Sequence, residues 1–274
     1  MNGDRFLIVL PTYNEAESLP RMVAALDRMR GSLPMAGDVL VVDDGSPDGT
    51  GRIADDLASR NPWLQVMHRD AKQGLGRAYL AGFSWALERD YSHILEMDCD
   101  LSHPVESLPA MLTASAEADL VLGSRYVAGG GVAGWPLSRR LISRGGGRYA
   151  SMLLGLPVKD PTGGFKCFRA DALRSIGLSG LQAGGYAFQI ETTYRAARLG
   201  LRVVEVPITF RDRTRGNSKM SAGIAVEAAW RVPLLRLHRP AAPGPAAHAA
   251  VDHVPHLAGS VPLHERRTRR RPLP

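Results

Sequence analysis

Short apolar runs, each ending in polar residues, constrain the fold of this chain more than any other feature. Residues 6–10 (FLIVL), 39–42 (VLVV) and 120–122 (LVL) contain no polar side chain. Residues 64–67 (LQVM) and 93–97 (HILEM) are similar runs that include one or two polar residues. A continuous apolar run of this length is typical of a strand buried on both faces of a parallel sheet. Stretches with helical spacing of apolar residues separate several of these runs. The alternation predicts an α/β fold with a doubly wound, mostly parallel sheet.

Polar motifs follow the predicted strands at the points where the strands end. In a doubly wound sheet, ligands bind beyond the carboxyl ends of the strands. We therefore expect these motifs to meet at one edge of the sheet and to form the site. They are residues 11–15 (PTYNE), 43–46 (DDGS), 98–100 (DCD) and 123–125 (GSR).

The distribution of charge divides the chain into a body and a tail. The net charge is +7, and residues 234–274 contribute +5 of it, from seven arginines less Asp252 and Glu265. That segment also holds seven prolines and no sustained periodicity, which predicts a disordered tail after a single domain over residues 1–233. The body is left with only +2, which disfavours a nucleic-acid partner.

The two cysteines, Cys99 and Cys167, lie far apart in the sequence without CxxC spacing, which favours a reducing compartment over a disulfide framework. The first residues do not resemble a secretory signal, and no run reaches the roughly 18 apolar residues that span a bilayer. We expect a cytoplasmic protein. If its acceptor is a lipid, the protein would meet it from the inner face of the membrane.

The pair Asp98 and Asp100 is the strongest candidate for a metal site. Side chains two apart on a strand point to the same face, so both carboxylates are able to converge on one hard cation such as Mg²⁺ or Mn²⁺. Such a cation would also bind two phosphate oxygens. The alternative is that the two acids cap the next helix or face water.

Two further loops favour a nucleotide. A carboxylate of Asp43 or Asp44 would accept hydrogen bonds from a nucleobase edge, although the same sequence fits an ordinary Asx-type turn. Residues 72–77 (KQGLGR) open a helix with two cations and two glycines, which suits a diphosphate, or simply a solvated helix start. Neither loop is decisive alone.

The second half of the chain is less regular. Helices are expected over residues 138–154, in spite of the glycines at 145–147, and over 220–231. Strands are expected over 203–206 and 208–210. Residues 160–166 (DPTGGFK) predict a turn or a catalytic loop, and residues 185–191 open a helix.

In this order the motifs resemble family 2 glycosyltransferases of GT-A fold, and within them the dolichol- or polyprenol-phosphate mannose synthases. The resemblance runs from about residue 6 to 231. The first four matching segments, residues 11–15, 41–50, 74–79 and 97–103, suit many family 2 enzymes. The segments DPTGGFKCFR, GYAFQIE and EVPITFRDRTRGNSKM point to the polyprenol-phosphate subgroup. The tail does not share the resemblance.

The resemblance implies a role for each matching residue. Asp98 and Asp100 would bind the metal, Arg125, Arg139 and Ser143 would bind the acceptor phosphate, and Asp100, Arg125 and Arg213 would act in catalysis. The donor GDP-mannose would be held by Pro11, Tyr13, Glu15, Val42, Asp43, Asp44, Gly74, Arg77, Asp98, Cys99, Gln189, Arg213 and Lys219.

The implied reaction is inverting transfer of mannose to a polyprenyl monophosphate, giving a β-linked product. A phosphate monoester is largely ionised near neutral pH, so we expect no catalytic base. The alternatives are transfer of glucose or another sugar to the same lipid, a sugar-1-phosphate nucleotidyltransferase, and a non-catalytic nucleotide-binding module. A membrane partner subunit is possible.

Overall fold

The computed structural model describes residues 4–178, 181, 185–212 and 231–237. Its strands are β1 (Arg5–Thr12), β2 (Ala36–Asp43), β3 (Leu64–His68), β4 (His93–Glu96), β5 (Leu120–Ser124), β6 (Gly131–Ala133), β7 (Lys166–Arg169), β8 (Val203–Pro207) and β9 (Thr209–Arg211). Its helices are α1 (Ser18–Arg30), α2 (Thr50–Ala58), α3 (Leu75–Leu87), α4 (Leu108–Ala114), α5 (Leu137–Leu154), α6 (Ala170–Ile176) and α7 (Gly185–Arg198), with a 3-10 turn, η1 (Val105–Ser107), before α4.

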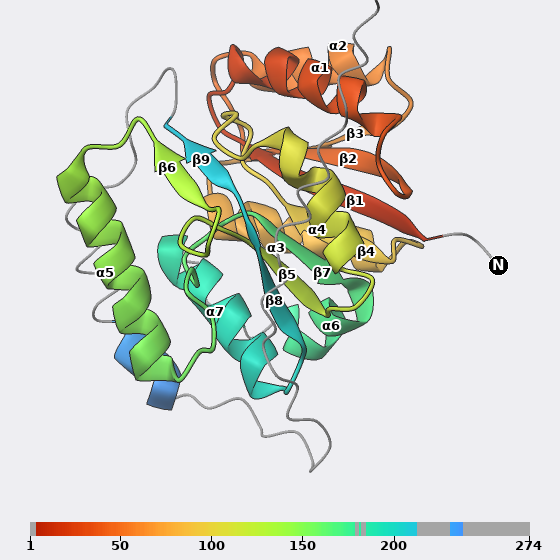
Figure 1. Cartoon of the computed structure of the whole chain (residues 1–274). Helices are drawn as coiled ribbons and strands as arrows, with labels where there is room; N and C mark the ends of the chain where they lie inside the picture. The colour runs from red at the N-terminus through yellow and green to blue at the C-terminus, as the bar shows by residue number, and fades with distance from the viewer. Residues whose placement is uncertain (1–3, 179–180, 182–184, 213–230, 238–274) are drawn as a thin grey trace, which may run out of the picture.

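Seven strands form one sheet in the order β3-β2-β1-β4-β7-β5-β8. Six of them run parallel to one another, and β7 runs antiparallel to both of its neighbours. Helices cover both faces (Figure 1). The predicted α/β fold with a doubly wound, mostly parallel sheet is therefore confirmed.

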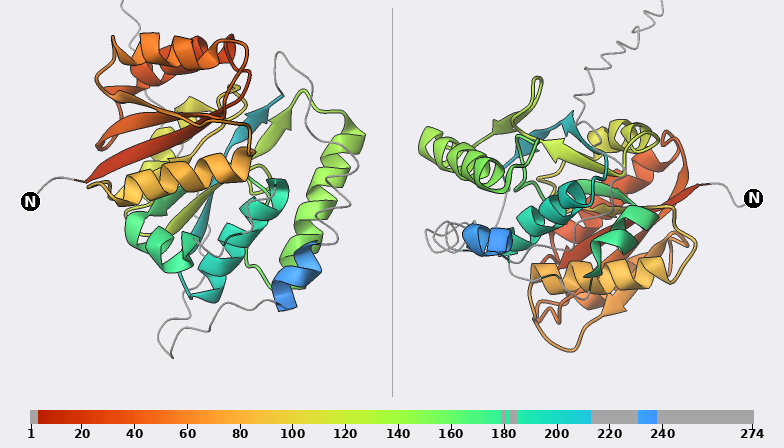
Figure 2. Two further views of the ribbon diagram at one scale, coloured as in Figure 1. Left: turned by 180° about the vertical axis from the view of Figure 1, so that it is seen from behind. Right: turned by 90° about the horizontal axis from the view of Figure 1, so that it is seen from below.

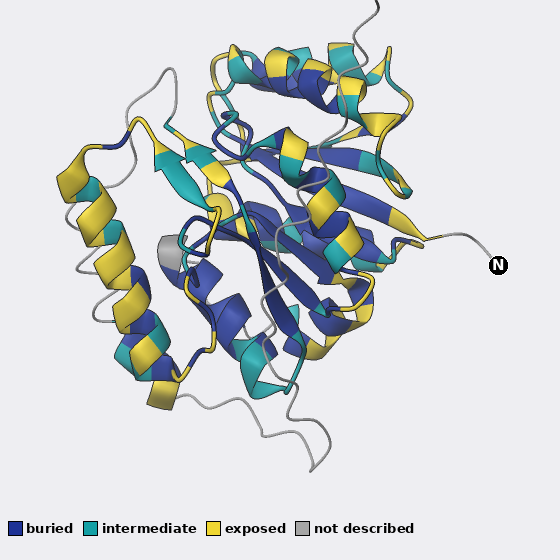
Figure 3. Cartoon of the chain, in the orientation of Figure 1, coloured by how far each residue is buried: buried dark blue, intermediate teal, exposed yellow. Residues whose placement is uncertain are grey.

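Burial on both faces explains the continuous apolar runs. Along β1, Leu7 and Val9 belong to the core under α3 and α7, whereas Phe6, Ile8 and Leu10 belong to the core under α1, α2 and α4. Successive side chains of a strand point to opposite faces, so both sets must be apolar when both faces are covered. The buried strands and the exposed outer sides of the helices are visible in Figure 3.

Strand β1 lies at the point where the chain changes direction across the sheet. From β1 the chain moves outward through β2 and β3, and β4 then returns to the other side of β1. A crevice opens beyond the carboxyl ends of the strands at such a switch point. The motifs that follow β1 and β4, residues 13–15 and 98–100, lie at this crevice.

Strand β7 and helix α6 were not predicted from the sequence. Residues 166–169 (KCFR) begin and end with a cation, and they follow a Gly-rich turn, so they do not resemble a central strand. Lys166 nevertheless pairs with Glu96 on β4 and with Leu122 on β5. The strand is specified by its neighbours and by the buried Cys167 and Phe168 rather than by its own pattern.

Helix α5 lies beside the sheet rather than on it, next to the small parallel pair β6–β9 (Figures 1 and 2). Residues 231–237 form a further helix, in which Val232 and Leu235 are buried in the same core cluster as Ala150 and Leu154 of α5, and Arg236 donates to the Leu153 carbonyl. The predicted boundary at residue 233 therefore falls within a packed helix. The predicted helix over 220–231 lies largely outside the described residues, as does the tail from 238.

Helix α5 runs without interruption through its three glycines, as predicted. A Cβ atom added at Gly145 or Gly146 would meet no atom within 4 Å, and neither residue has a positive φ. These two glycines therefore weaken the helix without a compensating contact.

We predict that Gly145→Ala and Gly146→Ala each raise the free energy of unfolding by about 1 kcal/mol, because alanine is the better helix former by that amount. Urea denaturation followed by circular dichroism measures the change. Gly82→Ala on α3 is the matched control: its Cβ would collide with the side chain of Val9, so it should destabilise the protein. Destabilisation by the α5 variants would show that α5 is not a regular helix in solution.

Candidate active site

The crevice at the β1–β4 switch point, called the switch-point cleft below, contains most of the residues that the sequence predicted for the donor. Its walls come from the ends of β1, β2 and β4 and from the start of α3. The residues that line it are Pro11, Thr12, Tyr13, Glu15, Asp44, Lys72, Gly74, Leu75, Ala78, Asp98, Cys99 and Asp100. Motifs separated by almost 90 positions in the chain thus meet at one place.

Asp98 and Asp100 follow β4 directly and are held in different ways. The Tyr79 hydroxyl donates to Asp98 Oδ1 at 3.2 Å, and the Asp98 backbone N–H donates to His103 Nδ1 at 3.0 Å. The Ser102 backbone N–H donates to Asp100 Oδ1 at 2.9 Å. The Asp98 side chain is 25% exposed and lines the cleft.

Tyr79 and His103 are positioning residues that the sequence did not reveal. Burial and the neighbouring charge of Asp98 raise the pKa of Tyr79 well above its ordinary value, so its hydroxyl remains a donor. The imidazole of His103 stacks on Phe165 with the ring centroids 5.1 Å apart. His103 is buried, and its Nδ1 orders the backbone of the carboxylate motif.

The carboxylates suit a divalent cation that is shared with a substrate. Among the described residues, no group of three or more His, Cys, Asp or Glu side chains is placed to hold a metal ion. Asp98 and Asp100 alone would leave most coordination positions to phosphate oxygens and water. Mg²⁺ in nucleotide sites is commonly bound in this way, by one or two carboxylates together with substrate phosphates.

The carboxylates of Asp43 and Asp44 accept hydrogen bonds that connect neighbouring loops. Asp43 accepts hydrogen bonds from the hydroxyls of Thr12 and Ser46, which fits the alternative of an Asx-type turn. Asp44 accepts from Arg69 Nη1 at 2.5 Å and from the backbone N–H of Gly74 at 2.8 Å. Asp44 lines the cleft, whereas Asp43 and the core residue Val42 are not among its lining residues.

The two cations of the glycine loop have different surroundings. The Lys72 ammonium lies 4.0 Å from the centre of the Tyr13 ring, and both residues line the cleft. Arg77 is exposed on α3 and is not among the lining residues. Lys72 therefore lies at the cleft, whereas Arg77, which the resemblance assigned to the donor, is not among its lining residues.

A buried polar cluster lies beneath the carboxylate motif. Burial raises the pKa of Glu96 to about 7, against the lowering effects of Lys166 and Gln189, and burial lowers the pKa of Lys166 to about 8. Lys166 Nζ donates to the Gln189 carbonyl at 2.6 Å and to Thr192 Oγ1 at 2.8 Å. The Gln189 side chain is 4% exposed, and its hydrogen bond to the Glu96 carboxylate places it within this buried cluster.

Arg125 is engaged by the loop that precedes β7. Its Nε and Nη2 donate to the two carboxylate oxygens of Asp160 at 2.7 Å, and Nη2 also donates to Thr162. Glu205 on β8 in turn accepts hydrogen bonds from the backbone N–H groups of Lys159 and Asp160. Burial would raise the pKa of Asp160, but the guanidinium and its hydrogen bonds outweigh that effect and hold the pKa below its ordinary value.

The three predicted acceptor-phosphate residues each contact an aromatic side chain, either Trp135 or Tyr126. The guanidinium of Arg139 lies 4.0 Å from the Trp135 ring centre, and that of Arg125 lies 5.8 Å from it. Arg139 also pairs with Asp212 at 3.1 Å. The Tyr126 hydroxyl donates to Ser143 Oγ at 2.7 Å. An acceptor phosphate bound by Arg125 and Arg139 would therefore lie beside arginines that already pair with Asp160 and Asp212.

Two predicted residues, Arg213 and Lys219, lie outside the described residues.

Comparison with known proteins identifies the family of the chain. The model of the family described as glycosyl transferase family 2 matches residues 7–177. An undecaprenyl-phosphate mannosyltransferase from Micrococcus luteus is 53% identical over 83% of this chain and 92% of its own length. A polyprenol monophosphomannose synthase from Mycolicibacterium smegmatis is 49% identical over 83% of this chain and 85% of its own length.

The chain belongs to glycosyl transferase family 2. The resemblance inferred from the motifs is thereby confirmed. A mannosyltransferase from Pyrobaculum calidifontis, solved with GDP-Man and Mn²⁺, has the same fold, with a TM-score of 0.60 at 17% identity over 88% of this chain and 67% of that one. At that identity the likeness concerns the GT-A fold alone.

We predict that Asp160→Asn lowers the free energy of unfolding by about 3–5 kcal/mol at pH 7, because it removes the carboxylate that faces the buried Arg125 charge. Urea denaturation measures the loss. The exposed pair of Asp171 and Arg174 provides the control, and Asp171→Asn should cost less than about 1 kcal/mol.

The difference in the free energy of unfolding between wild type and Asp160→Asn has a defined pH dependence. The pKa of Asp160 is depressed in the folded protein, so its contribution is complete above the unfolded pKa of about 4 and is lost as pH falls through the lower folded value. The difference between wild type and Asp160→Asn should stay constant from pH 7 to 5 and shrink below pH 4. A difference that is already absent at pH 7 would contradict the buried pair.

Proposed function

We propose that this chain transfers mannose from GDP-mannose to the phosphate of a polyprenyl monophosphate, with inversion at the anomeric carbon. The observation that carries the proposal is the switch-point cleft, where Asp98 and Asp100 meet the nucleotide-side motif of residues 11–15. The two relatives that are about half identical over most of their length support both the sugar and the lipid acceptor.

The donor would lie across the cleft. Pro11, Tyr13 and Glu15 would contact the nucleoside, and Lys72 would neutralise part of the diphosphate charge. Asp44 would act through the loop that it holds, because its carboxylate fixes the backbone at Gly74. Gln189 would reach the donor from the opposite side, a role that rests on the family resemblance. The assignments of Val42, Asp43 and Arg77 receive less support, since none of them lines the cleft.

Mg²⁺ or Mn²⁺ would be bound by Asp98 and Asp100. When bound, such an ion supplies positive charge to the diphosphate as it leaves. The residues of the chain prepare this position: the Tyr79 hydroxyl and the His103 ring fix Asp98, and Ser102 fixes Asp100. The two aspartates would then be electrostatic anchors rather than acid–base catalysts.

The acceptor phosphate would be bound by Arg125, Arg139 and Ser143. As a phosphate monoester it carries its own nucleophilic charge, so it attacks the anomeric carbon without a base from the protein. The fork between Arg125 and Asp160 holds the guanidinium in place before the acceptor arrives. Arg213 and Lys219 complete the proposed set through the family resemblance alone.

A lipid acceptor requires contact with a membrane. No helix among the described residues is long and apolar enough to cross one. We propose that the chain works as a peripheral protein at the inner face of the membrane, where a membrane partner subunit would be able to join it. Transfer of another sugar to the same lipid is the nearest alternative.

The reaction is tested by incubating the full chain with labelled GDP-mannose, UDP-glucose or UDP-galactose and a short polyprenyl phosphate in detergent, with and without EDTA. We expect transfer from GDP-mannose only, complete loss in EDTA and recovery on addition of Mn²⁺ or Mg²⁺. Transfer that ignores EDTA would refute the metal, and transfer only from another donor would refute mannose.

Asp100→Asn should lower kcat/KM by at least about 100-fold while leaving the unfolding midpoint nearly unchanged, because it removes a charge that the departing diphosphate requires. Asp171→Asn removes an equal charge from the exposed face of α6 and should retain full activity. Equal activity of Asp100→Asn and wild type would exclude a catalytic role for the carboxylate.

A further inference from the structure

Strand β9 is joined directly to the carboxylate motif that follows β4. It pairs in parallel with β6, and Phe210 lies opposite Val132 in this pair. The backbone N–H of Arg211 donates to the Ser102 carbonyl at 3.2 Å. The backbone N–H of Ser102 in turn donates to Asp100 Oδ1 at 2.9 Å. A displacement of β9 would therefore be transmitted to the loop that holds Asp100.

The ring of Phe210 contacts residues on both the donor and the acceptor side of the proposed site. Its centroid lies 5.7 Å from that of His103 and 5.4 Å from that of Trp135, with interplanar angles of 72° and 65°. Both contacts are edge-to-face, an arrangement that aromatic pairs prefer. The guanidinium carbon of Arg125 lies 5.7 Å from the centre of the same ring, within the range of a cation–π contact. One half-buried side chain thus connects two groups of functional residues.

On the donor side, the contact with Phe210 reaches the carboxylate motif through His103. The His103 ring is buried and stacks on Phe165 with the centroids 5.1 Å apart. Its Nδ1 accepts the hydrogen bond from the backbone N–H of Asp98 at 3.0 Å. Because His103 contacts Phe165 and Phe210 as well as this N–H group, the two phenylalanine rings fix the height at which Asp98 leaves β4.

On the acceptor side, Trp135 and the end of β9 hold the second arginine. The Arg139 guanidinium lies 4.0 Å from the Trp135 ring centre and pairs with Asp212 at 3.1 Å. Asp212 follows β9 directly, and its backbone N–H donates to the Ala133 carbonyl at 3.0 Å. Within the described part of the chain, Trp135 Nε1 has no hydrogen-bond partner. The ring contacts of Trp135, including the one with Phe210, therefore fix its position.

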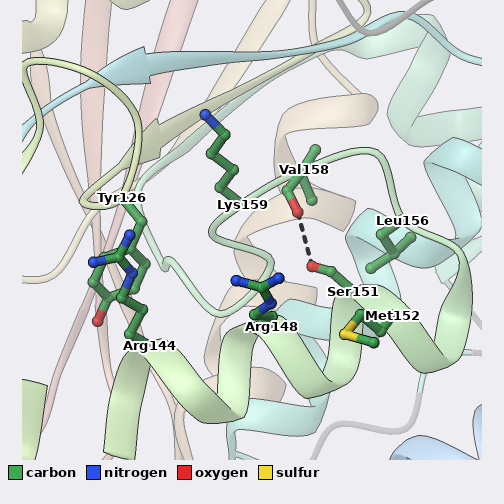
Figure 4. A pocket seen from close by; sticks show the side chains of 8 residues that line it. All are labelled: Tyr126, Arg144, Arg148, Ser151, Met152, Leu156, Val158 and Lys159. Carbon is green, nitrogen blue, oxygen red and sulfur yellow. Dashed lines mark hydrogen bonds between the residues drawn. The ribbon is translucent and has the colours of Figure 1, made fainter. Parts of the chain in front are cut away.

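The walls of the acceptor groove do not by themselves locate a phosphate. A groove of about 380 Å³ reaches Arg125, and a second of about 370 Å³ adjoins it, since Tyr126 and Arg144 line both (Figure 4). Either space is large compared with one phosphate group. A phosphate in so wide a groove is located by the cations that bind it. The positions of Arg125 and Arg139 therefore decide where the nucleophilic oxygen lies.

Inverting transfer requires that this oxygen lie in line with the leaving group. The acceptor oxygen forms a bond to the anomeric carbon while the bond from that carbon to the diphosphate breaks, and the diphosphate leaves with the electron pair. The two oxygens are then on opposite sides of the carbon. A misplacement of about 1 Å can cost on the order of 100-fold in rate. The separation between the acceptor arginines and the carboxylate motif must therefore be held constant.

We propose that Phe210 is a positioning residue of the transfer reaction, because its ring fixes the separation between the acceptor arginines and the carboxylates Asp98 and Asp100. The inference rests on the proposed function, since it concerns the same two substrates. Phe210 acts through His103, Trp135 and the arginines and not on the reacting atoms. The apolar pattern of residues 208–210 predicts a strand but gives no sign of this role.

The test compares full-length wild type and Phe210→Leu, with GDP-mannose, Mn²⁺ and a short polyprenyl phosphate in detergent. We expect kcat to fall on the order of 10- to 100-fold, since the separation is no longer fixed. KM for both substrates should change little, because every arginine and carboxylate remains. Calorimetry should likewise find an unchanged affinity for GDP with Mn²⁺. Phe210→Tyr keeps the ring and should retain the kcat of wild type.

Phe6→Leu is the matched control, because it makes the same substitution in a buried residue near the amino end of β1, whereas the switch-point cleft lies at the carboxyl ends of the strands. It should lower the unfolding midpoint and retain kcat. Phe210→Met has no ring but an adaptable side chain that fills irregular space, so it should fold and show the same fall in kcat as Phe210→Leu. Variants of Phe210 that lose stability but keep kcat would overturn the inference, since the ring would then only pack.

The outcomes separate this inference from the proposed function. Absence of transfer by wild type would refute the proposed function, and the inference with it. Transfer by wild type with an unchanged kcat in Phe210→Leu would overturn the inference alone. A rise in the acceptor KM without a fall in kcat, or a loss of affinity for GDP with Mn²⁺ as large as the fall in kcat, would also overturn it. Phe210 would then serve one substrate and not the separation between the two.

Discussion

The pairing of β7 with both β4 and β5 is the constraint on which the rest of the structure depends. It joins the nucleotide-side strands to β5 and β8, and it is the one reversal of direction in the main sheet of the described structure. Its antiparallel direction brings the loop of residues 160–165 to the edge where the parallel strands end. Asp160 can face Arg125, and Phe165 can stack on His103, only because β7 lies between the two halves.

Several buried charged groups lie around this strand, and two of them, Asp160 and Arg125, pair directly. Lys166 on β7 faces the Glu96 position of β4, and Asp160 holds Arg125. Burying such groups costs free energy unless they are paired, so their presence at this edge favours a functional reason over a purely structural one. The matched charges hold the site in one geometry before a substrate binds.

The sequence predicted the sheet well because its central strands are buried on both faces. In β1 and β2 this condition leaves a continuous apolar run, which is visible without any knowledge of neighbours. Prediction from the sequence failed for β7, because the cations at its two ends are explained only by partners that come from distant parts of the chain. The switch-point cleft was predicted from the strand-end rule, whereas Tyr79 was not, since a helical tyrosine gives no sign that its hydroxyl will reach Asp98. Arg77, assigned to the donor by the resemblance, is exposed on α3 outside the lining of the cleft, and its role stays a prediction.

The central claim is that Asp98 and Asp100 place a divalent cation against the donor diphosphate at the switch-point cleft. Diffraction from crystals grown with GDP and Mn²⁺, with an anomalous difference map calculated at the manganese edge, tests it most directly. The account predicts one strong peak that is bound by both carboxylates and by oxygens of both phosphates. A diphosphate bound without such a peak, or a manganese ion held away from these two aspartates, would contradict it.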